Sequence, residues 1–156
     1  MTITFLWLGK SKNKHYDSII DDYKKRLKHY TSFSIKELKD PKHKSKKKDD
    51  ITKAEAELIL SKLSPSDYVV LLDELGKHKT SEELSNWVQH KLNISISNVI
   101  FIIAGAYGAH PLLKDRADYK FALSHLTLTH DMARMFIIEQ VYRAFTILKG
   151  EKYHNS

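Results

Sequence analysis

The chain has 156 residues and a formal net charge of +7, with 26 lysines and arginines against 19 aspartates and glutamates. This length predicts a single domain over residues 1–156 that buries about two thirds of its extended-chain surface. The absence of cysteine excludes a disulfide framework and a thiolate metal site, and it fits a reducing cytoplasm. No apolar run approaches the roughly 20 residues of a membrane span, and the excess of positive charge favours a polyanionic partner.

The first half of the sequence alternates apolar runs with helical patterns. Ile3–Leu8 is an apolar run that predicts a buried strand. Residues 16–30 follow with apolar side chains at helical spacing, which predicts an amphipathic helix, and Phe33–Leu38 alternate like a half-buried strand. Beyond a charged segment, residues 51–63 repeat the helical pattern, and Tyr68–Asp73 form an apolar run that predicts a third strand.

The second half continues this alternation. Thr80 and Glu83 have the spacing of a capping box, which predicts the start of a third helix. A fourth buried strand begins near Val99, and after one short helix a long helix is predicted over residues 131–149, ended by Gly150. Strands that alternate with helices predict an α/β fold with a mostly parallel sheet flanked by helices.

The fourth predicted strand ends in a loop that contains two glycines. The stretch VIFIIAGAYGAH, residues 99–110, runs from an apolar strand into Gly105 and Gly108. It lacks the G-x-G-x-x-G spacing of a dinucleotide site and the G-K-[ST] of a phosphate-binding P-loop. Two interpretations stay open: the glycines permit positive φ in a tight loop, or the loop belongs to a binding site of another kind.

Three segments are expected to meet at one edge of the sheet, because open α/β sheets bind ligands beyond the carboxyl ends of their strands. They are LDELGK after the third strand, AGAYG after the fourth, and LSHLTLTH before the long helix. Backbone N–H and C=O groups of these segments would face the edge of an adenosine in a largely apolar pocket.

These motifs resemble the SPOUT class of knotted methyltransferases over nearly the whole chain. Within that class the chain is similar to the small family that methylates ring nitrogen 3 of a pseudouridine in large-subunit (23S) ribosomal RNA. The resemblance is carried by FLWLGK, YKKRLKHY, LDELGK, the glycine loop, LSHLTLTH and, as the most specific segment, IIEQVYRAFTILKGEKYH. It implies a C-terminal trefoil knot, S-adenosyl-L-methionine bent within it as methyl donor, a homodimer with the knot region at its interface, and ribosomal RNA in the assembled ribosome as substrate.

By the same resemblance, residues of the three loops line the cofactor site. They are Leu72, Ala104, Gly105, Gly108, Leu123, Ser124, His125, Leu126, Thr127 and Leu128. Two positions depart from the family pattern: Ala104 stands where the loop begins with glycine, and Thr129 stands where proline precedes the long helix. Alanine is tolerated there if its φ is negative, and threonine is a fair helix cap.

The end of the long helix and the tail supply the candidate catalytic residues. The reaction needs an acceptor nitrogen that is held in line with the methyl group and helped to lose a proton. Arg143 would stabilise a developing oxyanion or hold a phosphate, Tyr153 would stack on the base, and His154 would accept the proton or hydrogen-bond the base. Tyr142 is a further candidate beside them. The competing interpretation is an ion pair between Arg143 and Glu139 and a solvated tail.

The remaining charged and apolar features concern partners and assembly. The lysine-rich segment Lys39–Lys48 is either a solvated charge run or a contact to RNA phosphates. Met132, Met135 and Phe136 are expected in the core or at the interface of a homodimer held largely by the long helix.

Two alternatives to this enzyme stay open. One is a non-catalytic RNA- or ribosome-binding protein that keeps the fold, and the other is a methyltransferase for another RNA nucleotide. Binding of S-adenosyl-L-methionine would separate the first alternative from an enzyme. No metal is expected, because His125 and His130 are poorly spaced for joint ligation and no carboxylate cluster accompanies them.

Overall fold

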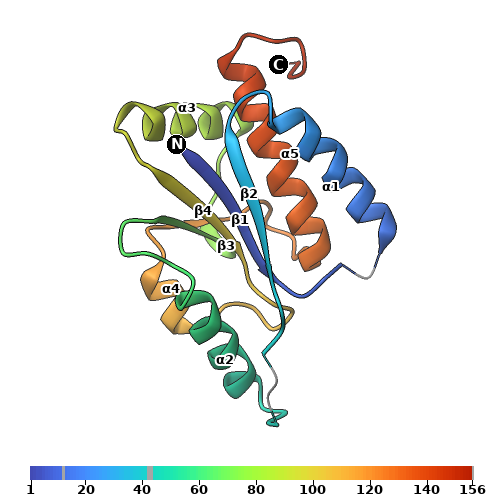
Figure 1. Ribbon diagram of the computed structural model, residues 1–156, viewed down its shortest axis with the longest axis vertical. Coiled ribbons are helices and arrows are strands. Elements are labelled where there is room, and N and C mark those ends of the chain that lie inside the picture. Colours follow the sequence, from blue (N-terminus) through green and yellow to red (C-terminus); the bar gives the residue numbers. More distant parts are fainter. Residues whose placement is uncertain (12, 42–43, 156) are drawn as a thin grey trace.

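Five parallel strands form one sheet in the order β2-β1-β4-β3-β5, in a computed structural model that describes residues 1–11, 13–41 and 44–155 (Figure 1). Every pairing between neighbouring strands is parallel, which confirms the predicted mostly parallel sheet. The strands are β1 (Thr2–Leu8), β2 (Ser32–Leu38), β3 (Tyr68–Lys77), β4 (Asn98–Ile103) and β5 (Tyr119–Phe121).

The helices between and after the strands lie close to their predicted positions. They are α1 (Lys14–Leu27), α2 (Lys48–Leu60), α3 (Ser81–Asn93), α4 (Pro111–Arg116) and α5 (His130–Leu148). The capping box at the start of α3 is confirmed: the N–H of Glu83 donates to Oγ1 of Thr80, and the N–H of Thr80 donates to Oε2 of Glu83. Thr129 caps α5 by accepting from the N–H of Met132 at 3.3 Å. Within the described ranges, none of the helices is long and apolar enough to cross a membrane.

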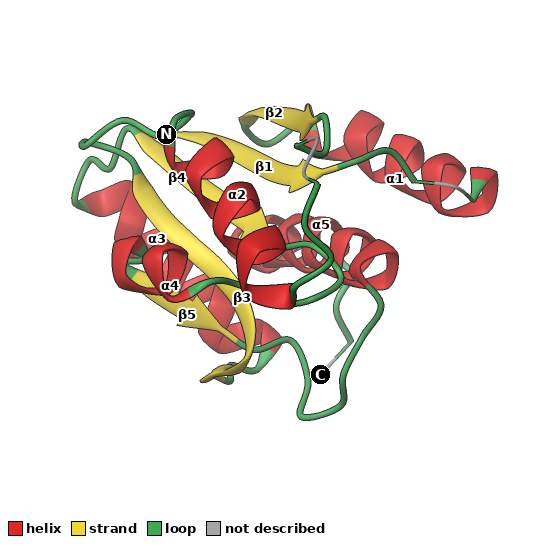
Figure 2. Cartoon of the chain, turned by 90° about the horizontal axis from the view of Figure 1, so that it is seen from below, coloured by secondary structure: helices red, strands yellow, loops and turns green. Residues whose placement is uncertain are grey.

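The alternation of side chains along each strand divides the core between the two faces of the sheet. On β1, Phe5 and Trp7 point to one face and Leu6 to the other, and all three are buried. α1, α3 and α5 cover the first face, whereas α2 and α4 cover the second (Figure 1, Figure 2). Because both faces are covered, the central strands have the continuous apolar runs that identify them in the sequence.

The carboxyl end of β3 differs from the prediction. β3 continues past Asp73 to Lys77 and pairs with β5, a three-residue strand that no sequence pattern predicted. At Gly76, an added Cβ would lie 2.7 Å from the backbone of Lys120, so the two segments approach each other more closely than a side chain allows. A three-residue strand is too short to show a period, which explains why it was missed.

A buried arginine fixes the start of α5 against the end of β1. Arg134 is 2 % exposed, and its Nη2 donates to the carbonyl oxygen of Leu8, a residue 126 positions away in the sequence. Its Nη1 lies 3.3 Å from Oδ1 of Asp131, which partly balances the buried charge. These contacts bring the first turns of α5 to the carboxyl edge of the sheet.

Candidate active site

A cavity of about 630 Å³ lies at the carboxyl edge of the sheet, where open parallel sheets bind ligands. It is surrounded by the end of β3, the loops after β4 and β5, and the first turn of α5. The predicted cofactor residues in its lining are Leu72, Ala104, Gly105, Gly108, Leu123, Ser124, Leu126, Thr127 and Leu128. The fold therefore brings the three predicted loops to one cavity.

His125 is the predicted cofactor residue that the structure places outside this lining. Its imidazole packs on that of His78, just after β3, with ring centroids 3.7 Å apart. Two positions later, Oγ1 of Thr127 donates to Oε2 of Glu74 at 2.8 Å. Both contacts tie the loop 122–129 to the end of β3, and the His78–His125 pair is one of them.

The two loop glycines are needed for different structural reasons. Gly108 has a φ of +82°, which lies in the left-handed region that L side chains rarely adopt. Gly105 does not have a positive φ, but an added Cβ there would lie 2.7 Å from Oε1 of Glu55 on α2. Ala104 also lacks a positive φ, so its methyl group is tolerated. The tight-turn interpretation therefore holds for Gly108, whereas the close approach of α2 explains Gly105.

Charged side chains that the sequence did not assign to the cofactor also line the cavity. Asp73 and Glu74 follow the buried part of β3, and Lys48 begins α2. Oδ2 of Asp73 forms an ion pair with Nζ of Lys114 at 3.2 Å. Two acidic residues directly after an apolar strand were a usable signal for a polar site, but nothing in the sequence relates Lys48 to that edge of the sheet.

The predicted catalytic residues gather near the other end of α5. Nε of Arg143 donates to Oε1 of Glu139 at 3.0 Å, and Nη1 of Arg143 lies 3.3 Å from Nδ1 of His154. The hydroxyl of Tyr153 donates to the same oxygen of Glu139 at 3.0 Å, and the Arg143 guanidinium lies 4.7 Å from the centre of the Tyr153 ring. Tyr142 packs edge-on against Tyr153, with ring centroids 4.8 Å apart. The four predicted residues thus form one cluster around Glu139.

Hydrogen bonds and burial shift the pKa values of Arg143, Tyr153 and the neighbouring Glu82. The hydrogen bond to Glu139 raises the pKa of Arg143, so the guanidinium keeps its charge. Burial, and then hydrogen bonds to neighbouring oxygens, raises the pKa of Tyr153, whose hydroxyl stays a neutral donor. Nε2 of His154 lies 2.6 Å from Oε1 of Glu82 on α3, and this hydrogen bond lowers the pKa of Glu82 to about 2. The tail is therefore held against α3 and α5, and it is not simply solvated; Ser156 lies outside the described residues.

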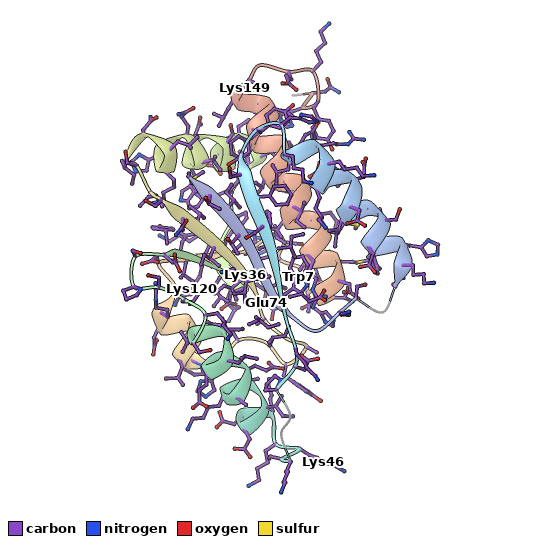
Figure 3. The ribbon with its side chains drawn as sticks, in the orientation of Figure 1. Trp7, Lys36, Lys46, Glu74, Lys120 and Lys149 are labelled. Atoms are coloured by element: carbon purple, nitrogen blue, oxygen red, sulfur yellow. The ribbon has the colours of Figure 1, made fainter. Side chains whose placement is uncertain are left out.

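The cavity and the catalytic cluster are far apart within one chain. Ala133 lines the cavity, and Arg143 lies ten residues further along α5, which is a rise of about 15 Å. In Figure 3, Glu74 of the cavity lies near the middle of the molecule, whereas Lys149, just after α5, lies near one end. Within one chain, Arg143 is therefore separated from the cavity.

The cavity suits a nucleoside that carries an amino-acid arm. Its volume is typical of small-molecule sites, and its lining combines apolar side chains such as Leu72 and Leu123 with the bare backbone of Gly105. Charged groups of both signs, Lys48 and Glu74, complete the lining. Adenosine joined to an amino acid needs the same combination of apolar, backbone and charged partners.

The comparison with known families shows the family to which the chain belongs. The model of a family described as "Predicted SPOUT methyltransferase" matches residues 1–154. The chain belongs to the SPOUT methyltransferase family. SPOUT methyltransferases use S-adenosyl-L-methionine as methyl donor, so this SPOUT methyltransferase is an enzyme with that cofactor.

Individual relatives of this SPOUT methyltransferase match over its full length. The protein named "Ribosomal RNA large subunit methyltransferase H" from Christiangramia forsetii is 43 % identical to this chain over 99 % of both chains. The protein of the same name from Cytophaga hutchinsonii is 42 % identical to it, over 96 % of this chain and 97 % of the relative. The protein of the same name from Phocaeicola vulgatus is 43 % identical over 99 % of both chains.

Proposed function

We propose that this SPOUT methyltransferase transfers the methyl group of S-adenosyl-L-methionine to ring nitrogen 3 of a pseudouridine in large-subunit (23S) ribosomal RNA. The observation that carries the proposal is the full-length similarity to proteins named Ribosomal RNA large subunit methyltransferase H. The nucleotide and its ring atom come from the resemblance of motifs such as IIEQVYRAFTILKGEKYH. A net charge of +7 supports a nucleic acid as partner, and action on assembled ribosomes implies the cytoplasm.

The donor half of the reaction belongs to the cavity at the carboxyl edge of the sheet. When bound, S-adenosyl-L-methionine supplies an electrophilic methyl group on its sulfonium. The backbone of Ala104–Gly108 and of the loop 122–129 would bind the adenosine, and Leu72 and Leu123 would exclude water from it. The trefoil knot that the family implies would form where the loop 122–129 and α5 meet this edge.

The acceptor half belongs to the cluster around Glu139. Loss of the N3 proton places negative charge on the carbonyl oxygens that flank this nitrogen, and a guanidinium carries five N–H donors in a planar fork. Glu139 accepts from one side of Arg143 and so orients the remaining donors toward the base. Tyr153 would stack on the base. His154, whose two ring nitrogens contact Arg143 and Glu82, would hydrogen-bond the base or accept its proton after exchanging one of these contacts.

A homodimer would join the two halves. Met132 and Phe136 are 37 % and 43 % exposed, and they share one stripe of α5 with Glu139 and Arg143. Consider two α5 helices that pack antiparallel and cross at Phe136. Arg143 lies seven residues after Phe136, and Thr129 lies seven residues before it. Arg143 of one subunit would therefore lie beside Thr129 of the partner subunit. Thr129 lines the cavity, so each cavity would receive Arg143 from the partner.

The proposal is tested with isotope-labelled S-adenosyl-L-methionine and purified acceptors. We expect label in the 23S RNA of assembled ribosomes, little label in the same RNA stripped of protein, and none with Arg143→Ala. A protein that binds the donor but labels no RNA would support the non-catalytic alternative. Label on a nucleotide other than a pseudouridine would support a methyltransferase with another acceptor.

A further inference from the structure

Among the described residues, the cavity lining carries more acidic side chains than lysines. Among the described residues, the lining carries two carboxylates, Asp73 and Glu74, and one lysine, Lys48. Asp73 pairs with Lys114 and accepts from the N–H of Leu75 at 3.0 Å, and Glu74 accepts from the loop 122–129. A ligand carboxylate would be repelled by both acidic residues, so Lys48 offers it the permanent positive charge in this lining.

The methyl donor carries such a carboxylate, on the same carbon as an ammonium group. We infer that Lys48 binds the carboxylate of the donor's amino-acid end, which orients the methionine arm between Lys48 and Glu74. The inference rests on the proposed donor cavity and adds a charged contact to it. It assigns to Lys48 a role in cofactor binding rather than in RNA binding.

The residues next to Lys48 support a role for Lys48 that differs from the role of the rest of the lysine-rich segment. The two acidic residues that follow it take other partners: Asp49 lies 3.5 Å from Nε2 of His110, and Asp50 accepts from Oγ of Ser45. Lys46 and Lys48 are both exposed, but Lys48 lines the cavity, whereas Lys46, two residues earlier, does not. In Figure 3, Lys46 lies at one end of the molecule, well away from Glu74.

The test uses calorimetric titration with two ligands that differ only in the group that Lys48 would bind. S-adenosyl-L-methionine has the carboxylate, and decarboxylated S-adenosylmethionine lacks it. We expect Lys48→Met to weaken binding of the first ligand about fivefold or more, and to leave binding of the second unchanged or slightly tighter. Lys48→Arg should retain most of the affinity, and Lys46→Met, the matched loss of one charge, should bind both ligands like the wild type.

Each other outcome overturns the inference. If Lys48→Met changes the affinity of both ligands alike, Lys48 acts on the shape or general field of the cavity. If it binds both ligands like the wild type but raises the apparent KM for ribosomes, Lys48 contacts RNA. If His130→Gln, and not Lys48→Met, weakens binding of S-adenosyl-L-methionine alone, the donor's carboxylate binds at the start of α5. A wild-type protein that binds neither ligand would contradict the donor cavity itself, which is a different failure.

Discussion

Arg143 donates from both Nε and Nη2 to the same carboxylate oxygen of Glu139, one turn earlier on α5. The sequence offered this ion pair as the alternative to a catalytic role for Arg143. The structure makes the two roles compatible, because the pair holds the guanidinium in one orientation. Nη1 lies 3.3 Å from Nδ1 of His154, and it carries a second N–H that can donate to another partner. A positioned charge is what electrostatic stabilisation of a transition state requires.

Replacing Arg143 should therefore reduce methyl transfer without affecting donor binding. We expect Arg143→Ala to lower the single-turnover rate on ribosomes about 100-fold or more, because the charge that forms on the base loses its partner. The affinity for S-adenosyl-L-methionine should stay within about twofold, since the cavity is formed by other residues. Arg143→Lys is the control for charge alone, and a weaker donor affinity in both variants would contradict the assignment.

Glycine substitutions should distinguish the close approach of a backbone at Gly76 from the close approach of a side chain at Gly105. In Gly76→Ala the new methyl group meets the backbone of Lys120, which cannot move aside, so the free energy of unfolding should fall by about 2 kcal/mol. In Gly105→Ala it meets the end of the Glu55 side chain, which can rotate, so the loss should be smaller. Chemical denaturation of the two variants at equal protein concentration measures this order, and the reverse order would disprove the explanation.

The proposed dimer predicts different results for neighbouring residues of α5. Phe136 is 43 % exposed, so Phe136→Asp should give a folded monomer. Met135 is partly buried against the core, so Met135→Asp should unfold the protein. Sedimentation and circular dichroism of both variants test this pair, and a wild-type monomer at micromolar concentration would end the dimer proposal.

Mixed dimers should recover the activity that each of two variants lacks. Ala104→Trp fills the cavity, and Arg143→Ala removes the catalytic cation, so each homodimer should be inactive. In a mixed dimer, one intact cavity meets the intact Arg143 of the partner subunit, and transfer should return at about half the wild-type rate per dimer. Mixed dimers without activity would indicate that each site is complete within one chain.

The sequence predicted most of the fold because the signals were local. The apolar run of β1 and the cap at Thr80 depend on residues that are neighbours in the chain, and both appear as predicted. β5 was missed because its three residues show no period, and its pairing with Val70–Leu72 of β3 is a contact between distant segments.

The candidate site was predictable only where the family resemblance applied. The resemblance selected the cavity loops and the cluster at Arg143, but it did not indicate that about 15 Å of α5 separates them in one chain. His125 was assigned with its neighbours in the loop, and its contact with His78 was not visible in the sequence. Lys48 appeared as one of a run of lysines, because only the fold brings the start of α2 to the cavity.

The most direct test of the central claim is a mass map of 23S ribosomal RNA from a strain that lacks this protein. The account predicts that one pseudouridine is lighter by a single methyl group than in the parent strain. The wild-type protein should restore that methyl group, and Arg143→Ala should not. Identical maps from the deletion and parent strains, or a missing methyl group on a different nucleotide, would contradict the account.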